Sequence, residues 1–190
     1  MRSSISSAIE PGDVIAFWRE AGWERWFSAD AAFDTAIRDR FAELHGRAAR
    51  GLLASWENEA PSALALILIT DQFSRNLYRH SALAFATDDL ARNAADRAIA
   101  HGFDRETEPL LRCFFYLPFE HHEDPSSQAR AVALFEDLAR ETDRHTELDY
   151  ALLHQRLIAR FGRFPHRNAV LGRISTPEEI AYLAQGGFMG

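Results

Sequence analysis

Apolar residues recur at helical spacing along most of this chain. Phe33, Ile37, Phe41 and Leu44 are four, four and three residues apart, so they share one face of a helix. The run 63–69 is apolar on every side and predicts a central, buried helix. No segment shows sustained period-two alternation with hairpin turns, which argues against strands. The pattern therefore predicts an all-α protein.

Capping and stop signals place the helix boundaries. Asp13, which follows a Pro-Gly pair, is the expected N-cap of the first helix, and Gly22 is its expected stop. The segment 107–116 has a helical pattern, and Pro118 is expected to turn the chain out of that helix. Residues 176–179, Thr-Pro-Glu-Glu, form a capping box with proline at the first helical position. The connections between these helices are short, which predicts antiparallel helical hairpins.

Length and composition fit a single domain over residues 1–190. The chain is 47% hydrophobic and 26% charged, as in ordinary globular proteins. A domain of this size buries roughly 70% of the surface that its unfolded chain exposes. The ends, 1–10 and 186–190, are expected to be flexible. The single cysteine, Cys113, lies in an apolar run and is expected to be a buried hydrophobic residue rather than a reactive thiol.

The charge pattern argues against several functions. The net charge is −7, and all 21 basic residues are arginine. Without lysine, the chain supports neither Schiff-base nor P-loop chemistry. An acidic chain without a long basic stripe is a poor nucleic-acid binder. The longest apolar run is far short of the ~20 residues that span a bilayer, so no membrane partner is expected. Residues 1–10 lack an apolar signal segment, which favours a cytoplasmic protein.

A first polar cluster directly follows the apolar run. If the helix continues, Asp71, Arg75 and Arg79 lie at positions i, i+4 and i+8 on one face, with Gln72 and Asn76 beside them. Asp71 is expected to pair with Arg75, because an acid before a base is the favoured order on a helix. A charged face at the end of so apolar a helix is expected to be partly buried. Its charges therefore need partners.

A second polar cluster consists of Glu120, His121, His122, Glu123 and Asp124. Carboxylates and imidazoles at this density can bind a divalent metal or transfer a proton. Their spacing matches no zinc motif, because the HExxH pattern is absent, so no metal site is predicted and any cofactor stays unknown. The preferred interpretation is a polar network with one titrating histidine.

A third polar cluster contains Arg163, His166, Arg167, Asn168 and Arg173. Glycine and proline at high density predict an irregular loop, and loops on a rigid scaffold often carry function. Guanidinium groups this close together can hold a carboxylate or a phosphate through paired hydrogen bonds.

Three sequence strings carry a resemblance to a known family. DQFSRNLYR, LPFEHHED and FGRFPHRNAVLGRISTPEE, in that order and spacing, resemble the bacterial domain-of-unknown-function family 924 over nearly the whole chain. The resemblance implies an all-α fold similar to tetratricopeptide-repeat proteins but without regular repeats, and it implies no activity. Two positions depart from the family pattern: Ser74 stands where proline is usual, and His122 stands where serine is common.

Two interpretations of the polar clusters stay open. In one, the arginines neutralise carboxylates between helical layers and only fix the packing. In the other, they line a pocket for a small anionic ligand or the acidic end of a peptide, because the clusters hold more arginines than nearby carboxylates. We prefer this binding module as the function. Its candidate ligand-binding residues are Asp71, Gln72, Arg75, Asn76, Arg79, Glu120, Arg163, Arg167, Asn168 and Arg173.

Two other classes of function fit the same residues. A hydrolase or isomerase would use His121 or His166 as a general base, oriented by Glu123 or Glu120. The candidate catalytic residues are then His121, Glu123 and His166, and two of these groups must lie within hydrogen-bond reach in an open cleft. A protein-interaction scaffold would instead leave an exposed apolar groove of roughly several hundred Å² away from the clusters. The sequence does not decide between enzyme and binding protein, and it gives no oligomeric state.

Overall fold

The computed structural model describes residues 8–190, and every regular element in that range is helical. The all-α prediction is confirmed for these residues, while 1–7, part of the predicted flexible start, lie outside the described range. The α-helices are α1 (Pro11–Trp26), α2 (Ala31–Ala49), α3 (Ala60–Ile67), α4 (Ser74–Leu77), α5 (Asp88–Ala100), α6 (Phe103–Glu106), α7 (Pro109–Glu120), α8 (Pro125–Thr142), α9 (Thr146–Phe161) and α10 (Pro177–Ala184). One π-helix, η2 (Leu68–Phe73), and the 3-10 helices η1 (Ala54–Asn58), η3 (Ala82–Phe85) and η4 (Pro165–Arg167) complete the described elements.

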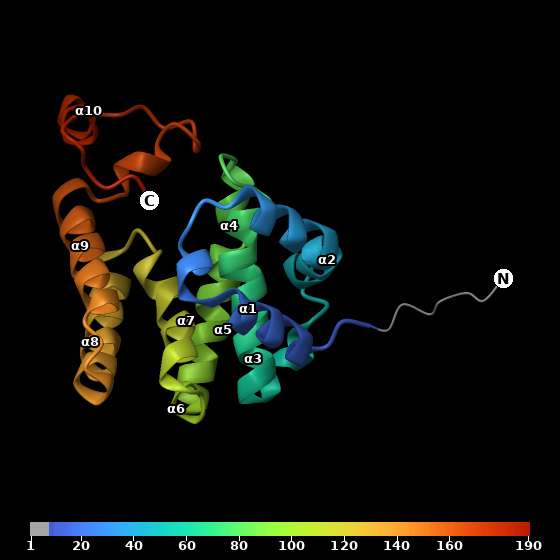
Figure 1. The fold of residues 1–190 in the computed structure, drawn as a ribbon. Helices are drawn as coiled ribbons and strands as arrows, with labels where there is room; N and C mark the ends of the chain where they lie inside the picture. Colours follow the sequence, from blue (N-terminus) through green and yellow to red (C-terminus); the bar gives the residue numbers. More distant parts are fainter. Residues whose placement is uncertain (1–7) are drawn as a thin grey trace.

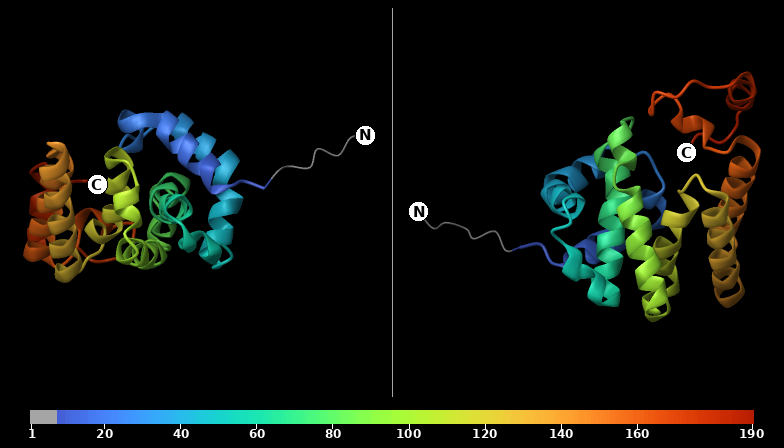
Figure 2. Two further views of the ribbon diagram at one scale, coloured as in Figure 1. Left: turned by 90° about the horizontal axis from the view of Figure 1, so that it is seen from below. Right: turned by 180° about the vertical axis from the view of Figure 1, so that it is seen from behind.

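The helices lie side by side in an array that roughly follows the order of the chain (Figures 1 and 2). α3 packs against α1 and α5, α5 packs against α7, and α8 packs against both α7 and α9. α2 packs on η2 and α4. Consecutive helices α7 to α9 therefore form packed neighbouring pairs. No helix in residues 8–190 is both long and apolar enough to cross a membrane.

Aromatic side chains fill the core between α1, α2, η2 and α7. Trp18, Phe73 and Phe114 are fully buried. The ring of Trp18 lies 5.5 Å from that of Phe73 and 5.5 Å from that of Phe114. Burying one such side chain contributes about 2–3 kcal/mol. Cys113 belongs to the same core, and burial raises the pKa of its thiol, as expected for an unreactive cysteine.

The first helix begins at another residue than the sequence suggested, but it is interrupted at the predicted one. Its N-cap is Glu10 rather than Asp13, whose side chain accepts a hydrogen bond of 2.9 Å from the backbone N–H of Glu10. Gly22 interrupts the helix, as predicted: its φ of 74° and ψ of 172° are not helical, and glycine adopts them because it has no Cβ. After this kink a second helical segment continues to Trp26.

The predicted turn at Pro118 is also wrong, because α7 runs through this residue to Glu120. Proline removes one intrahelical hydrogen bond, but the next turn still forms: the backbone N–H of His121 donates to the carbonyl of Leu117 at 2.8 Å. Pro118 lies close to the end of the helix, so few intrahelical hydrogen bonds follow the one that is lost. The consequence is that Glu120 and His121 project from the end of a long buried helix.

A π-helical turn carries the first polar cluster. α3 passes into η2 and then into α4 without a break, so the chain is helical from Ala60 to Leu77. The wider turn shifts the side chains that follow, and π-turns of this kind are frequent at functional sites. Asp71 and Arg75 stay within reach of each other, as predicted. Arg79 does not share their face: it lies beyond α4 and pairs with Asp34 of α2.

The C-terminal part of the chain, residues 162–190, lies across one end of the helical array, next to the end of α9 (Figure 1). The hydrophobic cluster under it is small: its buried members are Leu157 and Ile158 of α9 and Phe164. Thr176 caps α10 in the predicted capping box with Glu179. Within 186–190, which was predicted to be a flexible end, the ring of Phe188 lies 4.8 Å from that of His154.

Candidate functional site

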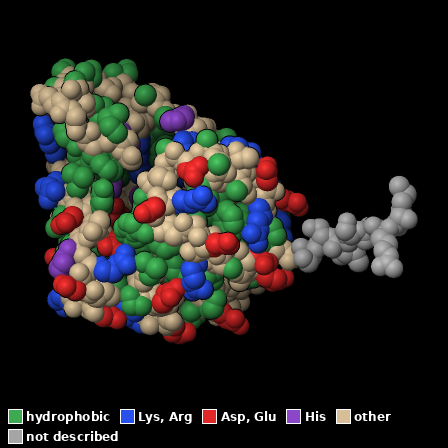
Figure 3. All heavy atoms as spheres, in the orientation of Figure 1, with side chains coloured by type: hydrophobic (Ala, Val, Ile, Leu, Met, Phe, Trp, Pro, Cys, Tyr) green, Lys and Arg blue, Asp and Glu red, His purple; other side chains and the backbone are tan. Residues whose placement is uncertain are grey.

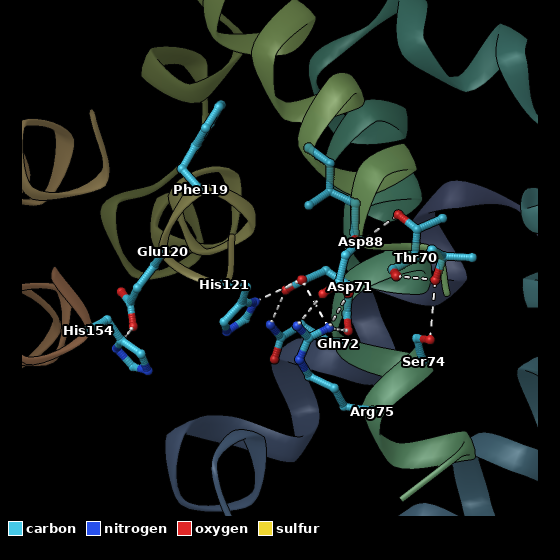
Figure 4. Close-up of polar contacts among 12 residues, drawn as sticks. Thr70, Asp71, Gln72, Ser74, Arg75, Asp88, Phe119, Glu120, His121 and His154 are labelled. Carbon is cyan, nitrogen blue, oxygen red and sulfur yellow. Dashed lines mark hydrogen bonds and ion pairs between the residues drawn. The ribbon is translucent and has the colours of Figure 1, made fainter. Parts of the chain in front are cut away.

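The three polar clusters meet in space around His121. Its Nδ1 lies 2.8 Å from Asp71 Oδ1, and its backbone carbonyl accepts a hydrogen bond of 2.9 Å from Arg167 Nη1. These contacts join the π-helix η2, the end of α7 and the short helix η4. Figure 4 shows the ring of His121 directed at the carboxylate of Asp71, with the polar ends of Gln72 and Arg75 beside the same carboxylate. One residue from each cluster therefore belongs to this centre.

Asp71 is the buried anion of the centre. Its side chain is 1% exposed, and it accepts a hydrogen bond of 2.6 Å from Gln72 Nε2 and lies 3.2 Å from Arg75 Nη1. Burial alone raises the pKa of this carboxyl, but the charge of Arg75 and the hydrogen bonds from His121 and Gln72 outweigh it. The net pKa is lowered, so Asp71 is ionised at neutral pH.

Arg75 connects Asp71 to a second carboxylate that the sequence analysis did not include. Its guanidinium donates to Asp88 Oδ1 at 3.0 Å and Oδ2 at 3.3 Å, and to the backbone carbonyl of Asp71 at 2.7 Å. Asp88 is the first residue of α5 and is acidic in its first turn, where the helix dipole favours an anion. Arg75 is thus matched by two carboxylates.

The other arginines of the clusters are mostly paired with one carboxylate each. Arg79 holds Asp34 through bonds of 2.7 and 2.7 Å, and Arg163 holds Glu179 at 2.7 and 2.8 Å. These are the two-point contacts that a guanidinium fork favours. Asn76 and Asn168 join the same pairs, donating to Asp34 at 2.8 Å and to Glu179 at 3.1 Å. These four predicted residues therefore belong to structural networks around the centre.

Glu123 ties the third cluster to the second. It accepts hydrogen bonds from Arg173 Nη1 at 2.6 Å and from the backbone N–H of Phe164 at 2.7 Å. Burial raises the pKa of Glu123, but these bonds outweigh burial and the net pKa is lowered. Glu123 is therefore an ionised anchor for the loop that carries η4.

Arg167 differs from the other four arginines because no carboxylate pairs with it within residues 8–190. Its only hydrogen bond to the described part of the chain is the one to the carbonyl of His121, and its Nε is buried without a partner. The residue is 8% exposed, and its guanidinium lies 4.7 Å from the ring of Phe85 and 4.5 Å from that of Phe164. Burial and the charge of Arg75 lower the pKa of Arg167 to about 10, which keeps it charged at neutral pH.

Neither His121 nor His166 pairs with Glu120 or Glu123 in the described part of the chain, contrary to the expected arrangement. Glu120 lies 2.7 Å from His154 Nδ1 on α9, and both side chains are almost fully buried. His121 pairs with Asp71 instead (Figure 4). His166 has no partner for its buried Nδ1 in the described chain, and burial followed by the charge of Arg167 lowers its pKa to about 4. His166 is therefore neutral at physiological pH.

Four residues of these networks lay outside the predicted clusters: Asp34, Asp88, His154 and Glu179. Each comes from a helix far along the chain from its partner, so no local spacing pointed to it. Only Asp88 had a usable local signal. It lies in the acidic first turn of a helix, where the helix dipole favours a carboxylate. Within residues 8–190, no group of three or more His, Cys, Asp or Glu is arranged to hold a metal ion.

The surface is hollowed between the C-terminal part of the chain and the helical array, and charged side-chain atoms are visible within this hollow (Figure 3). At the C-terminal end, a wide hollow of about 470 Å³ is lined by Leu153, Tyr182, Gln185, Gly186, Gly187 and Phe188. A smaller one of about 60 Å³ lies between η1, α3 and α5. None of the predicted site residues lines either of these two hollows.

The fold and its centre define the class: an all-α protein in which Arg, His and Asp side chains from three distant segments converge. The chain belongs to the family described as bacterial protein of unknown function (DUF924), whose model matches residues 14–187. A similar solved structure is the protein of unknown function ATU0120 from Agrobacterium tumefaciens. It has a TM-score of 0.87 and 47% identity, over 93% of this chain and 97% of that chain. A comparison with curated proteins gave no match.

Proposed function

We propose that this protein binds a small anion, a carboxylate or a phosphate group, at Arg167. The observation that carries the proposal is the missing counter-charge: Arg75, Arg79, Arg163 and Arg173 each hold a carboxylate, whereas Arg167 holds only a backbone carbonyl within the described residues 8–190. A buried charge without a partner is costly, and an anionic ligand would remove that cost.

The surroundings of Arg167 suit such a ligand. The rings of Phe85 and Phe164 flank the guanidinium and hold its plane, so the unused N–H groups need no further ordering when a ligand arrives. Because Arg167 is almost completely buried, a small ligand group fits better than a folded partner surface.

Isothermal titration with phosphate, acetate, succinate and benzoate tests the proposal. Wild type is expected to give saturable binding of at least one anion, weakened at least about tenfold in Arg167→Met by loss of the charged hydrogen bonds. A matched control is Arg160→Met, because Arg160 has an exposed partner, Glu178, and its substitution leaves binding unchanged. Absence of saturable heat from all four anions would refute the proposal.

Thermal unfolding without ligand separates this function from a purely structural role. Replacing an unpaired buried charge by an apolar group of similar length is neutral or stabilising. Arg167→Met is therefore expected to keep or raise the melting temperature. A strongly lowered melting temperature would assign Arg167 to the packing network instead.

Other features of the proposal come from the sequence. We take the protein to be a cytoplasmic bacterial protein of one domain, with a helical-hairpin architecture similar to tetratricopeptide-repeat proteins. We expect neither nucleic acid nor membrane among its partners. The acidic end of a peptide remains the second ligand consistent with Arg167, because a peptide carboxylate offers the same two oxygens as acetate.

A further inference from the structure

We propose that His121, oriented by Asp71, is a general base that activates water to hydrolyse an ester carrying the anionic group held by Arg167. The inference rests on the proposed function, since it takes the bound anion as the part of the substrate that places the ester bond. It differs from the histidine–glutamate pair expected from sequence, because the orienting residue is an aspartate fifty positions away.

The geometry leaves one nitrogen of His121 available. Nδ1 is engaged by Asp71 Oδ1 at 2.8 Å, while Nε2 has no hydrogen-bond partner in the described chain, and the side chain is 15% exposed. Asp71, at 1% exposure, is fixed by Gln72 and Arg75. A buried carboxylate with this many contacts cannot rotate freely, so it holds the imidazole in one orientation.

The protonation states also fit a base. An ionised Asp71 accepts a hydrogen bond from Nδ1–H, which selects the tautomer with its lone pair on Nε2. Burial and the charge of Arg75 lower the pKa of His121, although Asp71 opposes them, so the ring is neutral at pH 7. The charged groups around the ring are Asp71 and Arg75 from η2 and α4, Glu120 from α7 and Arg167 from η4.

Arg167 places the substrate next to this base. Its Nη1 donates to the carbonyl of His121 itself, so the guanidinium and the histidine are joined directly. An anion bound by the remaining N–H groups of Arg167 would therefore lie next to the residue that carries the imidazole. A small ester with a carboxylate at one end would therefore extend its other end across the histidine.

Water is the nucleophile in this scheme, because no hydroxyl or thiol of the described chain bonds to His121. Ser127 is engaged by His122, and the Cys113 thiol is sealed in the core. The water oxygen bonds to the ester carbonyl carbon while its proton passes to His121 Nε2. The carbon–oxygen bond to the alcohol then breaks, and the same proton passes to the departing oxygen. The products are a carboxylic acid and an alcohol, and the histidine returns to its neutral form.

The test uses 4-acetoxybenzoate, whose hydrolysis to 4-hydroxybenzoate and acetate is followed by liquid chromatography. Its methyl ester is the matched control substrate, because it has the same acetyl ester but lacks the carboxylate. Binding of 4-acetamidobenzoate, which resists hydrolysis, is measured in parallel by titration calorimetry. Wild type is expected to bind this analogue and to hydrolyse the charged ester faster than the neutral one.

Variants distinguish the roles. His121→Gln is expected to lower the hydrolysis rate about 100-fold or more while leaving binding of the analogue within about twofold. Asp71→Asn is expected to lower the rate and to shift the pH at which it rises, which a packing defect would not do. If Asp71→Asn does not fold, Gln72→Leu tests the support of the same carboxylate.

The outcomes separate the two proposals. Binding of the analogue that depends on Arg167, without hydrolysis that depends on His121, overturns the general base and leaves anion binding intact. Absence of both refutes both. Hydrolysis that persists in His121→Gln, or that is equal for the charged and the neutral ester, also overturns the inference.

Discussion

The helical array and the C-terminal part of the chain are stabilised in different ways. In the array, a large cluster of buried side chains from α1 to α9 is centred on rings such as Trp18 and Phe73. The C-terminal part packs on a small cluster, Leu157 and Ile158 of α9 with Phe164, and is also held by ion pairs, chiefly Arg163 with Glu179 and Arg173 with Glu123. Apolar burial dominates the first region, and charged hydrogen bonds determine the geometry of the second.

This difference matters for the candidate site, because the site lies where the two regions meet. Asp71 and His121 come from the well-packed array, whereas Arg167 comes from the weakly packed segment. Regions with few buried apolar contacts open at lower free energy than the core. The position of Arg167 therefore depends on ion pairs that can loosen while the rest of the protein stays folded.

The largest effect is expected in the array. Phe73→Ala removes a fully buried ring that packs against Trp18 and Phe41, and it should lower the free energy of unfolding by about 3–5 kcal/mol, measured by urea titration. Phe27→Ala is the matched control, since Phe27 is 53% exposed and its loss should cost much less. Equal losses at the two positions would show that burial is not what distinguishes them.

A smaller, local effect is expected from Glu123→Gln. Losing the charge weakens the bonds to Arg173 and Phe164, and should lower the local opening free energy of 164–190 by about 2–3 kcal/mol. Hydrogen exchange measures this opening residue by residue, and core amides such as that of Phe114 should keep their protection. Glu178→Gln serves as the control, because its pair with Arg160 is exposed and contributes about 0–1 kcal/mol. Loss of protection throughout the chain would contradict the separation of the two regions.

Gly187→Ala should destabilise the C-terminal part by about 1–3 kcal/mol. A Cβ at this position would overlap the ring of Tyr182, which must then move and lose the hydrogen bond of 2.8 Å from the backbone N–H of Phe188 to its hydroxyl. The same substitution in a Tyr182→Ala background should cost far less, since the overlap is gone. Denaturant titrations of the four proteins in this cycle measure the coupling, and a cost independent of Tyr182 would rule out the overlap.

The smallest effect on global stability is expected from acid. The hydrogen bond from Arg163 is the main cause that lowers the pKa of Glu179 from 4.5 to about 2. A carboxyl whose pKa is lowered on folding stabilises the fold above its unfolded pKa, and this contribution disappears as the pH falls from about 4.5 to about 2. Hydrogen exchange of 163–179 should therefore accelerate across this range. In Glu179→Gln the acceleration attributable to this carboxyl should be absent. An unchanged acid response in that variant would assign the effect to other groups.

The amino-acid sequence by itself determined the helical class and most of the helix positions. The apolar stripe from Phe33 to Leu44 and the capping box at Thr176 appear in α2 and α10 as predicted, because both depend on residues within a few positions of each other. Gly22 interrupts the first helix, as its local signal predicted. Pro118 is the exception, because α7 continues through a residue that locally favours a break.

Only the tertiary structure decided which charges meet. Local spacing paired Asp71 with Arg75 correctly, but it did not predict that Asp71 would also orient His121, or that Glu120 would pair with His154. It also did not single out Arg167 as the one arginine of the three clusters that pairs with no carboxylate within residues 8–190. Ion pairs between helices depend on how the helices are positioned against each other, and packing of the whole core sets that position. The spacing of residues along the sequence does not specify it.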